Sequence, residues 1–195
     1  GAAAAGIQDR RKLLQLLEGA DPQLFVDVFI MEAQGAVLDV QLLHDLPGAQ
    51  PGHVSRLTDD MRILFIGEGC DENRLTNKMI NYGFISSREE IRNVYSVADV
   101  MLNCTREESL SLLNVEVQAC GTPVITYSNT GVKETVDGCC GFAVENGNPE
   151  AMWNAMIAIK KRGKSSFSDT CIEWVKREFD RDKNYQKYLE LYQQI

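Results

Sequence analysis

The apolar residues of this chain fall into short runs rich in β-branched residues, separated by longer stretches with helical spacing. The runs predict strands at residues 24–30, 61–67, 81–85, 98–104, 123–127 and 141–144. Most of these runs lack alternating polar residues, which is typical of strands that are buried on both faces. Asp27 departs from the pattern because it places a charge inside the first run.

Helical periodicity and capping residues predict helices between and after these strands. The predicted helices cover residues 36–46, 87–96, 111–120 and 149–161, followed by two more toward the C-terminus. Ser-Arg-Glu-Glu at 87–90 is a capping box, and Asn148 followed by Pro149 is a cap with proline at the first helical position. Three of the predicted helices carry an apolar or aromatic stripe along one face. The stripe of the helix at 36–46 is Leu38, Leu42 and Leu46, and those of the two C-terminal helices are Ile172, Val175 and Phe179, and Tyr185, Tyr188, Leu189 and Tyr192. We expect part of the last stripe to be exposed.

Strands that alternate with helices predict an α/β fold, a parallel sheet with helices on both faces. In such folds ligands bind at the carboxyl ends of the strands, next to the N-termini of the following helices. The loop between the strand at 98–104 and the helix at 111–120 contains Glu108, which is therefore expected at the ligand-binding edge.

The length of 195 residues, 44% of them hydrophobic, is suited to a single domain over residues 1–195. All six cysteines and all six tyrosines follow Met61, so residues 1–60 have an atypical composition compared with 61–195. Residues 168–195 form the predicted helical tail.

The formal net charge of −8 argues against a nucleic-acid groove or a polybasic membrane contact, because both need clustered Lys and Arg. No apolar run approaches the roughly 18–20 residues of a membrane-spanning helix. The cysteines contain no Cys-x-x-Cys spacing and lie far from His44 and His53. We therefore expect reduced thiols, no bound metal and a cytoplasmic location.

Two carboxylates bracket the start of the helix predicted at 111–120. Glu108 and Glu116 are separated by about 12 Å along a helical rise, roughly the length of a nucleoside diphosphate sugar from ribose to hexose. The helix N-terminus between them suits an anion such as a diphosphate. Acidic residues near a helix start are also common for structural reasons, and the spacing alone favours that interpretation.

The sequence from Glu107 to Met156 resembles the nucleotide-binding domain of retaining glycosyltransferases of family four, which have the GT-B fold of two Rossmann-like domains. The resemblance rests on Glu108, seven residues, Glu116; then Ala-Cys-Gly-Thr-Pro-Val-Ile at 119–125; then Gly131 with Glu134, Asp137-Gly138 and Gly141. Upstream, "ILFIGEG", "YGFIS" and "IRNVYSVADVMLN" also resemble the family, so the similarity covers residues 61–159.

The resemblance implies a Rossmann-like fold, one half of GT-B, and a role for each part of the site. Glu108, as the catalytic-site residue, would bind hexose hydroxyls, and Glu116 would bind the ribose. The backbone of residues 109–112 would face the diphosphate and sugar, and residues 82–85 would lie near the base. The implied donor-binding residues are Glu116, Ser109, Leu110, Ser111, Leu112, Tyr82, Gly83, Phe84 and Ile85.

The implied function is transfer of a hexose from a nucleoside diphosphate sugar to a saccharide or lipid-linked acceptor, without a metal, as in polysaccharide biosynthesis. The acceptor-binding N-terminal domain would be a separate partner, so this chain alone would bind donor without turnover. Two departures bear on this. Ser109-Leu110-Ser111 replaces the usual Gly-Phe-Gly, and Glu32 and Gln34 stand where the family has cations for the diphosphate. The alternatives are a non-catalytic nucleotide-sugar-binding module and a hexosamine epimerase of the same fold.

Overall fold

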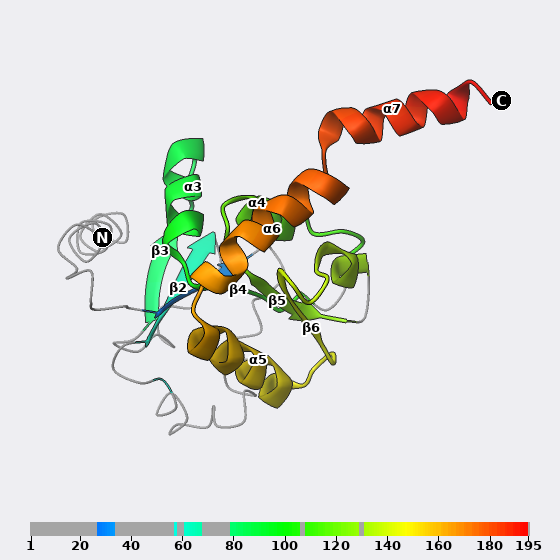
Figure 1. Cartoon of the computed structure of the whole chain (residues 1–195). Helices are drawn as coiled ribbons and strands as arrows, with labels where there is room; N and C mark the ends of the chain where they lie inside the picture. The colour runs from blue at the N-terminus through cyan, green and yellow to red at the C-terminus, as the bar shows by residue number, and fades with distance from the viewer. Residues whose placement is uncertain are drawn as a thin grey trace.

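The structure, a computed structural model, describes residues 27–33, 57, 61–67, 79–105, 108–128 and 131–194. Its centre is a six-stranded sheet with the strand order β3-β2-β1-β4-β5-β6 (Figure 1). All neighbouring strands are parallel. The strands are β1 (Asp27–Ala33), β2 (Met61–Gly67), β3 (Met79–Gly83), β4 (Val100–Asn103), β5 (Val124–Tyr127) and β6 (Gly141–Val144). The predicted α/β fold with a parallel sheet is confirmed.

Two strands are shifted along the sequence relative to the prediction, and the strand predicted at 98–104 is shorter, at Val100–Asn103. The first strand was expected at 24–30 but occupies Asp27–Ala33, where it pairs along the whole of β2, from Asp27 with Met61 to Ala33 with Gly67. Asp27 is therefore the first residue of the strand. The third strand was expected at 81–85 but ends at Gly83, whose φ is 73°. There the Gly83 N–H donates to Asn81 Oδ1 at 3.1 Å, a local turn that ends the strand.

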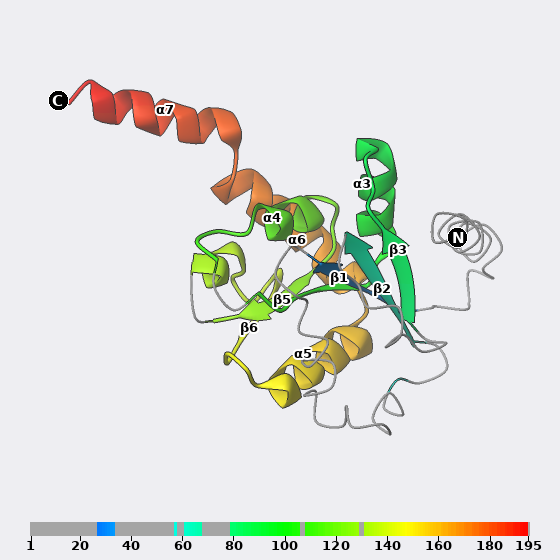
Figure 2. The same ribbon diagram turned by 180° about the vertical axis from the view of Figure 1, so that it is seen from behind.

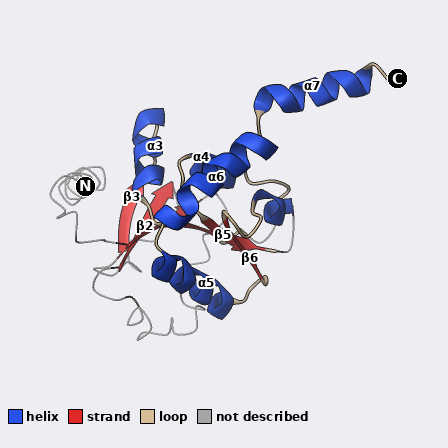
Figure 3. Cartoon of the chain, viewed as in Figure 1, coloured by secondary structure: helices blue, strands red, loops and turns tan. Residues whose placement is uncertain are grey.

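The helices at Arg88–Val97 and Pro149–Arg162 begin at the predicted capping residues. Figure 3 shows the helices in blue and the strands of the sheet in red. Ser87 Oγ accepts from the Glu90 N–H at 3.3 Å, and Asn148 Oδ1 accepts from the Ala151 N–H at 2.9 Å. The helices are α3 (Arg88–Val97), α4 (Leu112–Ala119), α5 (Pro149–Arg162), α6 (Ser165–Glu178) and α7 (Arg181–Tyr192), and a 3₁₀ helix, η3 (Gly131–Thr135), was not predicted. The helix predicted at 36–46 lies outside the described residues.

The core has two parts because alternate residues of the strands point to opposite faces of the sheet. On β2, Ile63 and Phe65 pack with α5 and the first half of α6, whereas Leu64 and Ile66 pack with α3 and α4. Figure 2 shows α5 on one side of the sheet, with α3 and α4 on the other. Apolar runs without polar alternation are thus explained by a sheet that is covered on both faces.

The last helix, α7, projects away from the rest of the molecule (Figures 1 and 2). It has no buried residue, and its apolar stripe is more than half exposed: Tyr185 62%, Tyr188 62%, Leu189 56% and Tyr192 73%. The expectation that part of this stripe is exposed is confirmed. Within the described part of the chain, no helix has both the length and the apolar character needed to cross a membrane.

Candidate functional site

The strand order reverses between β1 and β4, and this reversal is where open parallel sheets bind ligands. From β1 the chain proceeds outward through β2 to β3 on one side, and through β4, β5 and β6 on the other. A small hollow lies at the carboxyl end of β4. It is lined by Met101, Leu102, Asn103, Thr105, Glu108, Ser111 and Leu113. The loop that contains Glu108 therefore lies at the edge where the sequence placed it.

Asn103, the last residue of β4, ties the strand to the loop and to the following helix. Its Nδ2 donates to Ser111 Oγ at 3.0 Å and to Asn114 Oδ1 at 2.9 Å, and its Oδ1 accepts from the Thr105 N–H at 3.0 Å. Asn103 is only 5% exposed, and Ser111 and Asn114 are buried as well. One amide side chain thus uses both its donor and its acceptor to fix the two ends of the loop.

Ser111 is the N-cap residue of α4, but its side chain makes no capping hydrogen bond. The Ser111 hydroxyl instead accepts from Asn103. The first turn of α4 also contains no acidic residue. This helix start consequently keeps the positive end of the helix dipole without a capping side chain or a carboxylate of its own, which suits an anionic ligand.

The predicted site residues of this loop and of α4 differ in their exposure and in whether they line the hollow. Glu108 is half-buried and lines the hollow together with the buried Ser111. Leu110 is 39% exposed and Leu112 66%, and Ser109 is exposed too. Glu116 is exposed on the second turn of α4 and is not among the residues that line the hollow.

The segment predicted to lie near the base follows the edge strand β3. Tyr82 and Ile85 are buried in the core on the α3 side of the sheet, and the Tyr82 hydroxyl donates to Glu90 Oε1 at 3.0 Å. Phe84, in contrast, is 63% exposed. The Tyr82 and Ile85 side chains therefore serve packing, and Phe84 is the one in this segment that faces solvent most fully.

The unpredicted 3₁₀ helix η3 borders the same loop. A Cβ atom added to Gly131 would lie 1.7 Å from the carbonyl oxygen of Ser109, so glycine is required here by the close approach of two backbone segments. At the other end of η3, Thr135 Oγ1 accepts from Asn114 Nδ2 at 2.8 Å. The sequence pattern indicated Gly131 but not Asn103, Asn114 or Thr135. Asn103 and Asn114 each stand as a polar residue inside an apolar run, whereas Thr135 lies in a polar segment that gives no such signal.

The described residues contain no group of three or more His, Cys, Asp or Glu side chains placed to hold a metal ion. They include Cys104, Cys120, Cys139, Cys140 and Cys171, all as free thiols. The sixth cysteine, Cys70, lies outside the described residues. Burial raises the pKa of Cys171 to about 12, and it also raises the pKa of Cys140, so neither is poised as a nucleophile.

Comparison with known proteins gives one family and several relatives. Residues 43–161 match the family described as glycosyl transferases group 1. The chain is 26% identical over 174 residues to a D-inositol 3-phosphate glycosyltransferase of Mycolicibacterium gilvum, covering 88% of this chain and 37% of the relative. It is 32% identical over 108 residues to a GDP-mannose-dependent alpha-(1-6)-phosphatidylinositol dimannoside mannosyltransferase of Mycobacterium tuberculosis, covering 53% of this chain and 28% of the relative.

Among solved structures, the chain superposes on Anabaena HepE in complex with UDP-glucose with a TM-score of 0.71 and 18% identity. The match covers 96% of this chain and 53% of HepE. The chain therefore spans well under half the length of the curated relatives named above and about half of this structural neighbour. The shared fold is the Rossmann-like one.

Proposed function

The chain belongs to the glycosyl transferases group 1 family, and from this we propose that it is the donor-binding domain of a retaining GT-B glycosyltransferase. The donor is a nucleoside diphosphate sugar, and the group transferred is a hexose. The observation that carries the proposal is the hollow at the end of β4, where the half-buried Glu108 lies beside the start of α4. The UDP-glucose bound by HepE, a protein of the same fold, supports this class of donor.

In this proposal, the N-terminus of α4 receives the diphosphate, because its dipole and its first N–H groups favour negative charge. Glu108 accepts hydrogen bonds from hexose hydroxyls, and Glu116 accepts them from the ribose hydroxyls. Carboxylates form the stronger, charge-assisted type of hydrogen bond, so the two residues can select the ligand at both of its ends. The base lies near the exposed Phe84 and Gly83 at the end of β3.

The transfer reaction also needs a surface that binds the acceptor opposite the donor site. We propose that an N-terminal acceptor-binding domain supplies it, so that a saccharide or lipid-linked acceptor meets the donor sugar between two domains. During transfer the bond between the anomeric carbon and the diphosphate oxygen breaks, and a bond forms between that carbon and an acceptor hydroxyl oxygen, whose proton passes to the departing diphosphate. The α4 N-terminus stabilises the charge that develops on the leaving diphosphate.

A second candidate is a non-catalytic nucleotide-sugar-binding module. It is favoured by Glu32, which stands in β1 close to where the family has an arginine for the diphosphate. The relatives named above are glycosyltransferases, which favours transfer over epimerisation as the reaction of the site.

Calorimetric titration tests the proposal with UDP-, GDP- and ADP-hexoses and with the free nucleotides. We expect one nucleotide series to bind and the attached hexose to change the affinity. Absence of binding across the whole panel would contradict donor binding. A protein that contains this chain with its acceptor domain and binds the donor, but transfers no hexose to any acceptor, would instead support the non-catalytic module.

A further inference from the structure

The 3₁₀ helix η3 contacts the Glu108 loop at its first residue and the first turn of α4 at its last residue. Gly131, its first residue, lies against the Ser109 carbonyl so closely that a Cβ atom would not fit. Thr135, its last residue, accepts from Asn114 Nδ2 at 2.8 Å. The position of η3 therefore constrains both the loop and the first turn of α4.

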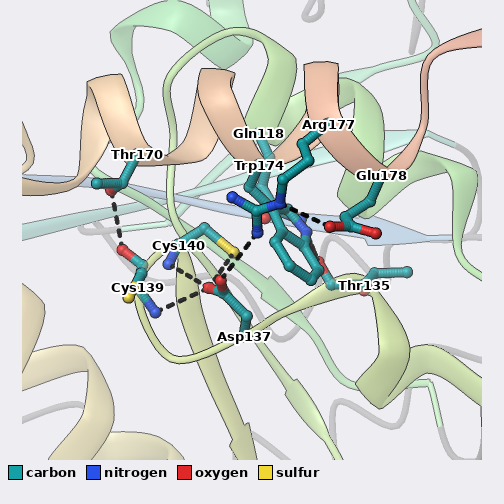
Figure 4. Close-up of polar contacts among 9 residues, drawn as sticks. All are labelled: Gln118, Thr135, Asp137, Cys139, Cys140, Thr170, Trp174, Arg177 and Glu178. Carbon is teal, nitrogen blue, oxygen red and sulfur yellow. Dashed lines mark hydrogen bonds and ion pairs between the residues drawn. The ribbon is translucent and has the colours of Figure 1, made fainter.

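On its other side η3 is held by α6. The Thr135 carbonyl accepts two hydrogen bonds, from Gln118 Nε2 of α4 at 2.8 Å and from the Trp174 indole Nε1 of α6 at 3.2 Å. Figure 4 shows Trp174 and Gln118 converging on Thr135. The Thr135 carbonyl thus joins η3 to both α4 and α6.

The turn that follows η3 is fastened to α6 as well (Figure 4). Asp137 Oδ1 accepts from the backbone N–H groups of Cys139 and Cys140, and its Oδ2 lies 3.8 Å from a guanidinium nitrogen of Arg177. The Thr170 hydroxyl oxygen lies 3.0 Å from the Cys139 carbonyl oxygen and 2.7 Å from the Phe167 carbonyl oxygen, so the two carbonyls share one donor. These contacts hold the turn against the same helix surface as Trp174.

The side chains of Asn103, Asn114 and Thr135 form a hydrogen-bond network in which each has a fixed role as donor or acceptor. Asn103 Nδ2 donates to the side-chain Oδ1 of Asn114, and Asn114 Nδ2 donates to the Thr135 hydroxyl. The Thr135 hydroxyl in turn donates to the Val132 backbone carbonyl at 2.6 Å. These three side chains are 5% exposed or less. An unpaired buried amide is costly, so removing one member destabilises the arrangement of the next.

We propose that Thr135 and Trp174 are positioning residues, through which α6 sets the geometry of the Glu108 loop and the start of α4. They act on the ligand only through Asn114, Asn103 and the loop backbone. The effect on donor affinity rests on the proposed function, whereas the effect on the loop itself does not.

The test is amide hydrogen exchange across residues 105–116 in Thr135→Val and Trp174→Phe. Valine keeps the volume of threonine but neither donates to Val132 nor accepts from Asn114. Phenylalanine keeps an aromatic ring against Phe179, whose centroid lies 6.4 Å from that of Trp174, but lacks the indole N–H. We expect up to about tenfold faster exchange in this segment, the effect of losing one or two hydrogen bonds, with β2 unchanged.

Two matched variants separate positioning from general loss of packing. Thr135→Ser retains the hydroxyl and should restore slow exchange. Thr126→Val makes the same change on β5 at a buried hydroxyl that has no hydrogen-bond partner among the described residues, and it should leave the segment unchanged. Equal effects of Thr135→Val and Thr126→Val, or exchange that rises uniformly across the sheet, would overturn the proposal.

Donor affinity is measured on the same variants. We expect Thr135→Val to weaken nucleotide-sugar binding and Thr135→Ser to restore it. If the wild-type chain binds no nucleotide sugar, the proposed function fails, while the exchange data still decide whether α6 positions the loop. If the exchange changes as expected but the affinity does not, α6 positions the loop without consequence for the ligand, and the inferred effect on donor binding is wrong.

Discussion

Glu116 makes no hydrogen bond or ion pair with the described residues that would call for a carboxylate at this position. It is exposed, and it lies beyond the first helical turn, where the dipole no longer favours an acid. We expect Glu116→Ala to keep or slightly raise the melting temperature, because alanine is the better helix former. If Glu116 binds ribose, the same change weakens nucleotide binding roughly tenfold or more, as measured by calorimetry.

Glu190→Ala is the matched control, since Glu190 is an exposed glutamate on α7. It should leave the nucleotide affinity at the wild-type value. A Glu116→Ala chain that binds nucleotide as tightly as this control would rule out the ribose role.

Glu108 is expected to bind a different part of the ligand from the part that Glu116 binds. We expect Glu108→Ala to weaken binding of the nucleotide sugar while leaving the free nucleoside diphosphate almost unaffected, because its partner is the hexose. Titrating both ligands against the variant checks the difference. Wild-type affinity of the Glu108, Glu116 double variant for both ligands would remove the transferase interpretation of this site.

Cys171 gives the stability a dependence on alkaline pH. Burial raises its pKa from 9.0 to about 12, so the unfolded chain loses this proton at lower pH than the folded one. Its contribution is fully present below pH 9 and is lost as pH rises from about 9 to 12. We expect Cys171→Ala to reduce the slope of unfolding free energy against pH in this window, measured by urea unfolding, whereas Cys139→Ala at an exposed position does not.

At the scale of elements, the sequence correctly predicted those strands and helix starts that depend on neighbouring residues alone. The strand Met61–Gly67 and the helix start at Pro149 were found correctly because an apolar run and a cap are visible in neighbouring residues. Strand ends were displaced where they depend on pairing, as for β1, or on a local turn, as at Gly83. The capping box is half formed, because Ser87 caps the helix while Glu90 accepts from Tyr82.

The position of Glu108 at the carboxyl end of β4 was predicted, but the side chains that support its loop were not. The family motif and the strand order both point to the loop after β4, where Glu108 lies. The Asn103, Asn114 and Thr135 network could not be predicted, because its bonds join residues 11 and 21 positions apart and depend on the packing of η3. The ligand roles of Glu108 and Glu116 stay predictions.

The backbone contact between η3 and the loop makes Gly131 a sensitive position. Gly131→Ala places a Cβ atom 1.7 Å from the Ser109 carbonyl oxygen, so one of the two segments must move. We expect a lower melting temperature together with weaker nucleotide-sugar binding, checked by thermal unfolding and calorimetry.

Gly147→Ala is the comparison, because its Cβ atom would meet nothing within 4 Å. Its φ of 68° still costs about 1–2 kcal/mol for a residue other than glycine. It should therefore lower stability without changing affinity, and an equal loss of affinity in both variants would contradict the steric explanation.

At the scale of the whole molecule, α7 adds length without adding to the core. Because none of its residues is buried, removing residues 181–195 should change the melting temperature by no more than about 2 °C. Removing residues 165–195 also deletes Phe167 and Cys171 from the core, and it should abolish cooperative unfolding. A large destabilisation by the shorter deletion would show that α7 packs on the body in solution.

The strand order has a consequence for the way the chain assembles. β1 lies at the centre of the sheet, with β2 on one side and β4 on the other, although β4 follows β1 by some 70 positions in the sequence. Parallel partners cannot be joined by a hairpin, so each pairing waits for a complete crossover. During synthesis, β1 can pair with β2 but keeps one edge open until residues 100–103 have emerged, and an open edge attracts other strands. The interval between the synthesis of β2 and that of β4 is therefore when a nascent chain of this protein is most exposed to misassociation.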